Sequence, residues 1–395
     1  MPSHPALMEP LLPAEGRPML AELSKQIFLH AGRLGGQIPA DKTRHQIAEV
    51  VRMMNSYYSN LIEGHKTIPK DIERAIKQDL SADPMARDNQ LLNVSHMAVE
   101  KEIEEQAGGE RFKACSTEFL CWIHREFFKS LPEELRTSHT KSGQPYQIMP
   151  GVIRDFNVDV ARHTPVDYRD LPRFLAVFEE KYDLGKMLPT NRLTAIAAAH
   201  HRFVWIHPFG DGNGRVARLF SHALLLQEEI GGYGLWTLSR GLARNKNEYF
   251  ERLNNADLPR VNDLDGRGNL SERYLVEFCE FFLKTILDQI QFMEKILKLS
   301  ELENGIAFYI SRVERVFGRD VEPGRRLLTQ VLHQGELRRG ELATVTGKGE
   351  TAARNILKLA LKAGLLASSN QKSPVYLAFP AKVLTTYFPG LYVES

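Results

Sequence analysis

The most constraining feature of this sequence is an apolar side chain at every third or fourth position along most of its length. Between residues 43 and 63 these positions are Ile47, Val50, Val51, Met54, Tyr58 and Leu61. This spacing places them on one face of an α-helix. The same periodicity predicts helices over 93–105, 116–131, 171–182, 193–206, 214–229, 246–255 and 270–299. We therefore expect a mainly α fold.

One stretch of the first 300 residues departs from this pattern. Residues 143–172 contain four prolines, and β-branched residues alternate with polar ones, as in Val158-Asp159-Val160. Proline interrupts helices, and a period of two is typical of strands. The segment 138–172 therefore predicts a small β-hairpin or extended flap.

The character of the chain changes again near residue 301. Beyond it we expect two short helices joined by a Thr-Gly turn, a third helix ending at Gly364, and two short strands. This order is typical of a winged helix-turn-helix. The sequence thus divides into an N-terminal helical region (1–95), a helical core (96–300) and a C-terminal winged helix (301–395). Residues 301–372 hold 12 Lys and Arg against 8 Asp and Glu, a small positive excess.

Composition excludes several classes of protein. The net charge of +2 over 395 residues is too small for a general polycation, so a nucleic-acid face would have to be local. The three cysteines are odd in number and form no CxxC pair, which argues against a disulfide framework or a structural zinc site. No run of about 18 apolar residues and no export signal is evident. We expect a soluble, cytoplasmic protein with no membrane partner.

The segment from His207 to Arg218, HPFGDGNGRVAR, concentrates polar chemistry between two predicted helices. Its three alternating glycines allow a close backbone approach to a ligand. Amide groups at the start of the following helix favour an anion. Arg215 and Arg218 stand on one side of the first turn of that helix, where cations need an anionic partner. A polyphosphate would supply one.

Two further side chains indicate what happens to this phosphate. Asp211 offers a hard oxygen ligand suited to Mg²⁺, and His207 is suited to accept a proton near neutral pH. Together they predict phosphoryl-type transfer. The pattern does not fit the dinucleotide-binding G-x-G-x-x-G, and a calcium loop would need Glu rather than His222 at its twelfth position. A merely structural turn would not explain this clustering.

The segment resembles the signature of the Fic family, H-P-F-x-[D/E]-G-N-G-R-x-x-R, at every specified position. The resemblance covers roughly residues 54–292. It implies a nucleotidyltransferase that moves AMP from ATP to a Ser, Thr or Tyr hydroxyl of a target protein. His207 would be the base and Asp211 would position Mg²⁺. The implied nucleotide-binding residues are Phe209, Gly210, Gly212, Asn213, Gly214, Arg215 and Arg218, with Arg218 reaching the γ-phosphate.

The same resemblance places two other segments. Residues 138–160 are similar to the family's flap, which docks the target backbone by strand addition, and Tyr146, Ile148 and Val152 are the candidates for that edge. Residues 247–253 correspond to the family's adenine pocket, which Tyr249 would line. From the residues alone, Tyr249 could equally be ordinary helix core.

Ser59-Asn60-Leu61-Ile62-Glu63-Gly64 matches the family's inhibitory pattern, [S/T]-x-x-x-E-[G/N]. A glutamate in the last turn of a helix opposes the dipole by about 0.3–1 kcal/mol, so pairing with an arginine would favour it. The resemblance implies that Glu63 pairs with Arg218 and holds ATP in a non-productive pose.

Three alternatives stay open. The chain could be a DNA-binding regulator with a nucleotide-sensing core, in which Lys348, Thr351, Arg354 and Asn355 open the recognition helix. It could be a hydrolase that removes AMP with the help of Glu63, or a transferase that uses another donor. The C-terminal region could also serve target selection or homodimerisation.

Overall fold

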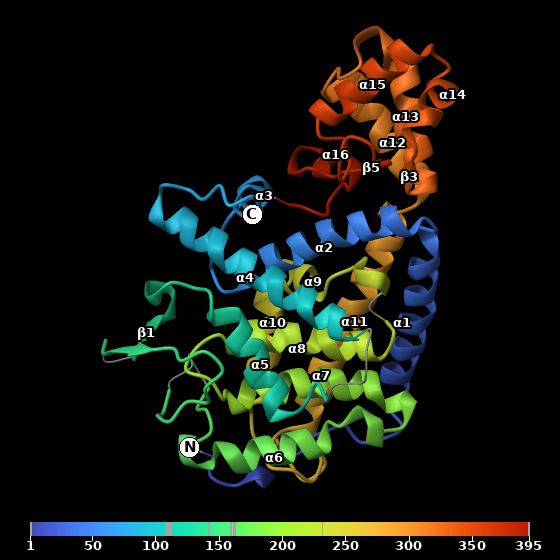
Figure 1. Ribbon diagram of the computed structural model, residues 1–395. Coiled ribbons are helices and arrows are strands. Elements are labelled where there is room, and N and C mark those ends of the chain that lie inside the picture. The colour runs from blue at the N-terminus through green and yellow to red at the C-terminus, as the bar shows by residue number, and fades with distance from the viewer. Residues whose placement is uncertain are drawn as a thin grey trace.

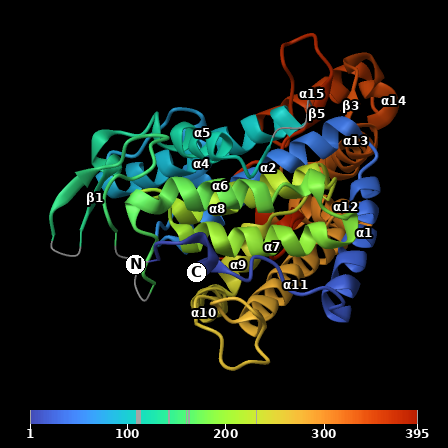
Figure 2. The ribbon, with the colours of Figure 1, turned by 90° about the horizontal axis from the view of Figure 1, so that it is seen from below.

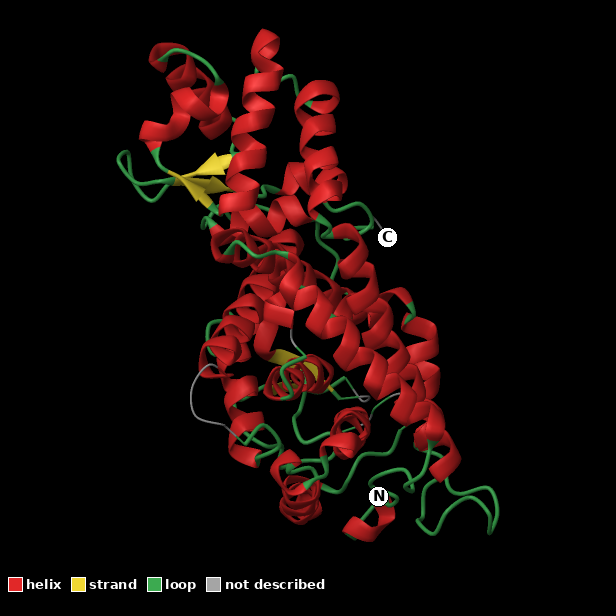
Figure 3. Cartoon of the chain, turned by 90° about the vertical axis from the view of Figure 1, so that its right-hand side faces the viewer, coloured by secondary structure: helices red, strands yellow, loops and turns green. Residues whose placement is uncertain are grey.

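The computed structural model describes residues 2–107, 113–140, 143–158, 160, 163–230 and 232–393. Helices dominate these residues, as Figure 3 shows, so the prediction of a mainly α fold is confirmed. The helices are α1 (Pro18–Gln37), α2 (Asp41–Ile62), α3 (Pro69–Ile76), α4 (Pro84–Ala107), α5 (Thr117–Phe128), α6 (Leu171–Lys181), α7 (Pro189–Ile206), α8 (Asn213–Gln227), α9 (Leu238–Arg244), α10 (Lys246–Ala256), α11 (Glu272–Ile296), α12 (Leu299–Phe308), α13 (Val321–Gln334), α14 (Leu342–Thr346), α15 (Glu350–Lys362) and α16 (Leu384–Tyr387).

Two small antiparallel sheets accompany the helices. The first pairs β1 (Thr137–His139) with β2 (Pro145–Gln147), with Ser138 opposite Tyr146. The second has the order β3-β5-β4, formed by Glu336–Leu337, Val375–Leu377 and Leu366–Ala367. The predicted hairpin is therefore present, at the start of the proline-rich segment. Of the Val158-Asp159-Val160 alternation, Val160 forms an isolated bridge with His163, and Asp159 lies outside the described residues.

Helix α7 lies inside the helical body, against α6, α8 and α11 (Figure 2). Its buried residues include Leu193, the alanines at 195 and 197–199 and Ile206, and also the polar His200, His201 and Arg202. A helix that is buried along most of its length belongs in a core. The end of α7 therefore fixes the start of the polar loop 207–218 rigidly within the molecule.

Helix α2 lies between this body and the C-terminal lobe, which Figure 1 shows in orange and red at the top. Its apolar face packs against α4 and α9. Thr43 donates a hydrogen bond to the carbonyl of Leu332, and Tyr58 donates one to the carbonyl of Leu391. The chain's last described residues thus return to α2, which links the two lobes.

Several predicted boundaries need correction. The helix predicted to begin at residue 93 begins at Pro84, so Asn93 and Ser95 lie in the interior of α4 and are buried. The helix predicted to end near Leu299 ends at Ile296, and α12 begins at Leu299. Helices α1 and α3 were not predicted. No helix among the described residues combines the length and apolar character needed to cross a membrane.

Candidate functional site

The polar loop joins two buried helices through two residues with left-handed backbone. His207 caps the end of α7 with φ +55°, and its amide donates to the carbonyl of Phe203. Gly212 caps the start of α8 with φ +80°, and a Cβ there would lie 2.6 Å from the ring of Phe128. Glycine is required at this position for both its backbone angle and its close contact.

The ring of His207 has a defined orientation. Nδ1 lies 3.2 Å from the carbonyl oxygen of Val204, which can only accept, so Nδ1 carries the proton. Nε2 of the neutral ring is then left with a lone pair. Burial lowers the pKa of His207 to about 3, which keeps the ring neutral. The neutral ring leaves Nε2 free to accept a proton, although the low pKa makes it a weaker base than an exposed histidine.

Asn213 braces the loop from within. Its side-chain oxygen accepts from the amide of Phe209 at 3.0 Å, and its side-chain nitrogen donates to the carbonyl of Phe209 at 2.9 Å. The ring of Phe209 stacks on His124 at 4.1 Å between centroids. His124 in turn bonds the carbonyl of Asp211 through Nε2, and the amide of Gly151 donates to its Nδ1. These contacts fix the backbone conformation of the loop independently of a ligand.

Asp211 and Arg215 differ in exposure. Asp211 is 47% exposed, and its Oδ2 lies 3.7 Å from Arg215 Nη2. Arg215 is buried against the rings of Phe127 and Phe128, whose centroids lie 5.0 and 5.5 Å from its guanidinium carbon. Asp211 is therefore the group of this loop that is open to a metal ion.

Arg218 is engaged by the end of α2. Its Nε donates to Ser59 Oγ, its Nη2 donates to the carbonyl of Ser59, both at 2.9 Å, and Nη2 pairs with Glu63 Oε1 at 2.6 Å. The Arg218 side chain is 2% exposed and that of Glu63 31%. A Cβ on Gly214 would lie 2.4 Å from Glu63 Oε1, so this carboxylate rests directly on the start of α8.

The charge of Glu63 is stabilised by this setting. Burial raises the pKa of Glu63, but the positive charges of Arg218 and Arg215 outweigh it, and the net pKa is lowered. Glu63 is thus an anion beside Arg218, where the family resemblance implies that the γ-phosphate would bind. Ser59, Glu63 and Arg218 are brought together as expected.

Arg154 was not identified from the sequence. This residue follows the hairpin in the chain and donates hydrogen bonds to the loop. Its Nε donates to the carbonyl of His207 at 2.8 Å, and its other nitrogens donate to the carbonyls of Phe156 and Val166. It is 4% exposed. A lone arginine in the short apolar run around Ile153 was the available signal, because such a charge must find partners when it is buried.

The residues expected to form the flap edge and the adenine pocket differ in their exposure. The hydroxyl of Tyr146 donates to the carbonyl of Gly210 at 2.8 Å, so the hairpin contacts the loop. Val152 is 54% exposed, but Ile148 is buried and offers no side chain to a partner. Tyr249 is 1% exposed and its hydroxyl lies 2.8 Å from His200 Nε2. Its ring has no free face for adenine.

Residues 114–225 match the Fic/DOC family. This segment is similar to Fic/DOC domains. It contains α5, the hairpin, α6, α7, the polar loop and most of α8, but not α2 with Ser59 and Glu63.

Curated proteins are similar to part of this chain. "Protein adenylyltransferase Fic" of Nematostella vectensis is 25% identical over 204 residues, which is 51% of this chain and 42% of that protein. "Protein adenylyltransferase fic-1" of Caenorhabditis elegans is 31% identical over 117 residues, 30% of this chain and 22% of that protein. The chain thus spans less than half the length of these relatives.

Solved structures share the fold over a longer range. A Fic family protein from Desulfovibrio desulfuricans G20 has a TM-score of 0.55 at 17% identity, covering 93% of this chain and 98% of that one. Fic-1 of Caenorhabditis elegans (residues 134–508) has a TM-score of 0.53 at 16% identity, covering 72% and 73%. At these identities the likeness establishes the fold alone.

Proposed function

We propose that this chain is a protein adenylyltransferase, which transfers AMP from ATP to a hydroxyl side chain of a target protein and is held inhibited by Glu63. The observation that carries the proposal is the free lone pair on Nε2 of His207. His207 begins a loop suited to bind an anion, and Asn213 holds the conformation of that loop. The names of the curated proteins to which the chain is similar support the same chemistry.

The proposed reaction follows from the loop. The target hydroxyl gives its proton to His207 Nε2 while its oxygen forms a bond to the α-phosphorus. The bond from that phosphorus to the bridging oxygen breaks, and pyrophosphate leaves with the electron pair. The loop amides and Arg215 would hold the α- and β-phosphates, and Arg218 would hold the γ-phosphate once it is released from Glu63.

The exposed carboxylate of Asp211 fits a Mg²⁺ ion, which takes few protein ligands and keeps the rest from phosphate and water. When bound, such an ion supplies positive charge beside the phosphates. Asp211, whose Oδ2 lies 3.7 Å from Arg215 Nη2, would hold it.

Labelled ATP tests the proposal. With Mg²⁺ and ATP labelled at the α-phosphate, Glu63→Gly should increase labelling of the chain or of proteins in a lysate, and His207→Ala should abolish it. ATP labelled at the γ-phosphate should give no signal, which separates AMP transfer from phosphorylation. Equal labelling of the two variants would contradict the assignment.

Hydrolytic removal of AMP is a second candidate, because the Glu63 side chain is 31% exposed and could position a water molecule. Protein labelled by the Glu63→Gly variant would be incubated with unmodified chain and without ATP. Release of AMP by the unmodified chain, but not by His207→Ala, would support this activity.

We also propose that residues 301–395 form a winged helix that docks a protein, either the target or a second copy of the chain, beside an N-terminal region (1–95) and a core (96–300). Two basic residues expected to face DNA are already paired, Lys348 with Asp320 at 3.0 Å and Arg354 with Glu350 at 2.8 Å. A gel shift at two salt concentrations tests the DNA alternative, which requires salt-sensitive binding.

A further inference from the structure

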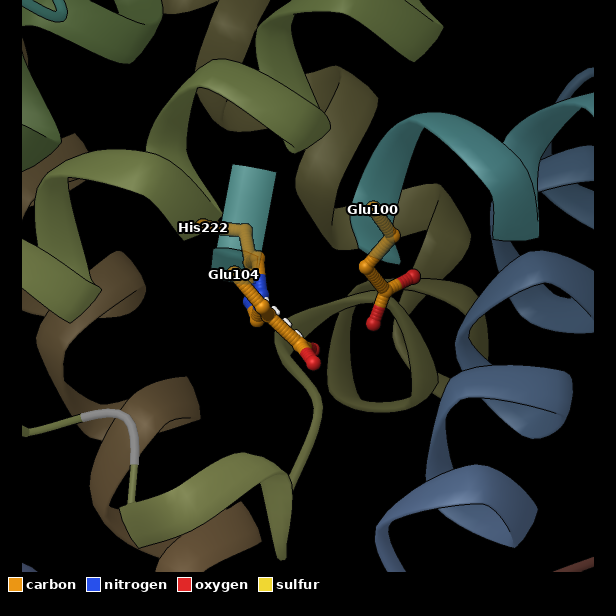
Figure 4. Close-up of side chains that lie close together, drawn as sticks. All are labelled: Glu100, Glu104 and His222. Atoms are coloured by element: carbon orange, nitrogen blue, oxygen red, sulfur yellow. Dashed lines mark ion pairs between the residues drawn. The ribbon is translucent and has the colours of Figure 1, made fainter. Parts of the chain in front are cut away.

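A second group of polar side chains lies where α4 meets α2 and α8, and Figure 4 shows three of them. Glu100 and Glu104 are four residues apart on α4, so they share one face of that helix. His222 comes from α8. We call Glu100, Glu104 and His222 the buried triad. A carboxylate oxygen of each glutamate and a ring nitrogen of the histidine all lie within 4.8 Å of one another.

The triad is shielded from solvent and contacts α2. The side chains of Glu100, Glu104 and His222 are 4%, 22% and 13% exposed. Asn55 of α2 donates to Glu100 Oε2 at 2.7 Å, and Arg52 of α2 pairs with Glu104. Carboxylates removed from water in this way need compensating positive charge.

The positive charge present does not balance the negative charge. Arg52 is shared between Glu104 and Glu49, whose Oε2 lies 2.6 Å from Arg52 Nη1. The two carboxylates of the triad therefore have one guanidinium nearby, which Glu104 shares with Glu49. With His222 neutral, a divalent cation would supply the positive charge that is missing.

Two imidazoles beside these carboxylates have ring nitrogens that form no hydrogen bond, although one nitrogen of each lies at ion-pair distance from a glutamate. Nε2 of His222 lies 3.5 Å from Glu104 Oε1, and Nδ1 of the fully buried His96 lies 3.5 Å from Glu100 Oε2. Among the residues that the structure describes, neither His222 Nε2 nor either nitrogen of His96 has a hydrogen-bond partner. Buried polar atoms are normally bonded, so these nitrogens indicate the position of a ligand.

We propose that the buried triad binds one divalent transition-metal ion such as Zn²⁺, through one oxygen each of Glu100 and Glu104 and through Nε2 of His222. A mixed set of imidazole and carboxylate donors suits Zn²⁺, whereas Mg²⁺ and Ca²⁺ favour oxygen donors alone. His96 would donate to Glu100 and orient it. Because Arg52 and Asn55 belong to α2, the ion would tie this helix to α4 and α8, whether or not the chain transfers AMP.

Direct measurement of metal binding tests the proposal independently of any activity. The full chain would be treated with EDTA, freed of the chelator and titrated with Zn²⁺ by calorimetry. We expect one ion per chain, with a Kd on the order of 1 μM or tighter. His222→Gln and Glu104→Gln should each weaken binding about tenfold or more, because each removes a ligand. Glu105→Gln, which changes a 65% exposed glutamate of the same helix, should bind as the unmodified chain does.

A second measurement covers variants that fold poorly. Co²⁺ bound by the unmodified chain should give visible absorption bands that Zn²⁺ removes and an equal concentration of Mg²⁺ does not. Binding to the unmodified chain weaker than about 100 μM would overturn the proposal and leave His222 as a protonated partner of Glu104. Unchanged affinity in a folded His222→Gln variant, confirmed by circular dichroism, would also overturn it.

Discussion

Replacing Glu63 with glutamine tests how Arg218 is shared between the protein and a nucleotide. In the structure, Arg218 is 2% exposed and makes three contacts with the end of α2. Only the contact with Glu63 Oε1, at 2.6 Å, joins two opposite charges. Glutamine has the same shape and removes the charge, so the change weakens this one contact and leaves the two contacts with Ser59.

The magnitude follows from the kind of bond that is lost. A hydrogen bond to a charged group contributes about 1.5–3 kcal/mol, and one between neutral groups about 0.5–1.5 kcal/mol. The Glu63→Gln change should therefore make the binding free energy of a ligand that contacts Arg218 more favourable by about 1–2 kcal/mol, which lowers its Kd by a factor of about 5–30. ATP has a γ-phosphate for Arg218 to bind, and ADP does not. The ratio of ATP to ADP affinity should rise by this factor.

Calorimetric titration with each nucleotide and Mg²⁺ measures the ratio. Both proteins would also carry His207→Ala, so that ATP is not consumed during the titration. Glu105→Gln is the matched control, because it removes an equivalent charge at an exposed site of α4. Its ratio should equal that of the His207→Ala parent.

Two results would refute the reasoning. If Glu63→Gln improved ATP and ADP binding by the same factor, Glu63 would act only by repelling anions from the start of α8. If neither affinity changed, the ion pair with Arg218 would not compete with the nucleotide at all. Only an effect specific to ATP supports competition at Arg218.

Three further predictions concern the loop and its surroundings. His207→Ala should abolish labelling but change the Kd for ATP less than about twofold, because the base is not a phosphate ligand. Arg154→Met should lower both the melting temperature and the labelling rate, the latter about tenfold or more, since the carbonyl of His207 loses its donor. Burial lowers the pKa values of His124 and His200 to about 3, below the value of about 6.5 for histidine in an unfolded chain. The free energy of unfolding that these neutral rings contribute is therefore fully present above about pH 6.5 and is lost as the pH falls. Chemical denaturation at pH 7 and pH 5 should show a loss of about 2 kcal/mol for each of these histidines.

The helices could be predicted because their signal is local. The apolar period and the Gly-rich loop placed α7, the loop and α8 within a few residues of where the structure has them. Helix α1 carries a comparable signal in Leu20, Leu23, Ile27 and Leu34, but the glycines at 32, 35 and 36 and the flanking proline weaken it. Packing of α1 along α11 outweighs this low local propensity.

The contacts that complete the site could not be predicted from local patterns. Glu63 and Arg218 are 155 residues apart in the chain, and only a family resemblance suggested their pairing. Arg154 contacts His207 across 53 residues, and no spacing in the sequence indicates it. Periodicity identifies the buried face of a helix but not the partner that buries it, so Tyr249 could not be assigned to the core in advance.

The packing of α2 also decides how inhibition could be relieved. Among the buried side chains of α2 are Ile47, Val51, Met54 and Ile62, and each contributes about 1.5–3 kcal/mol by burial. Removing the whole helix would therefore cost far more than the 1.5–3 kcal/mol of the Glu63–Arg218 contact.

Glu63, by contrast, is the capping residue after the last turn of α2 and is 31% exposed, so its side chain can rotate while the helix stays. We expect amide hydrogen exchange of residues 47–60 to be the same in Glu63→Gln and in the unmodified chain, with and without ATP. Faster exchange of α2 in the variant would show that relief of inhibition involves movement of the helix as well as rotation of the Glu63 side chain.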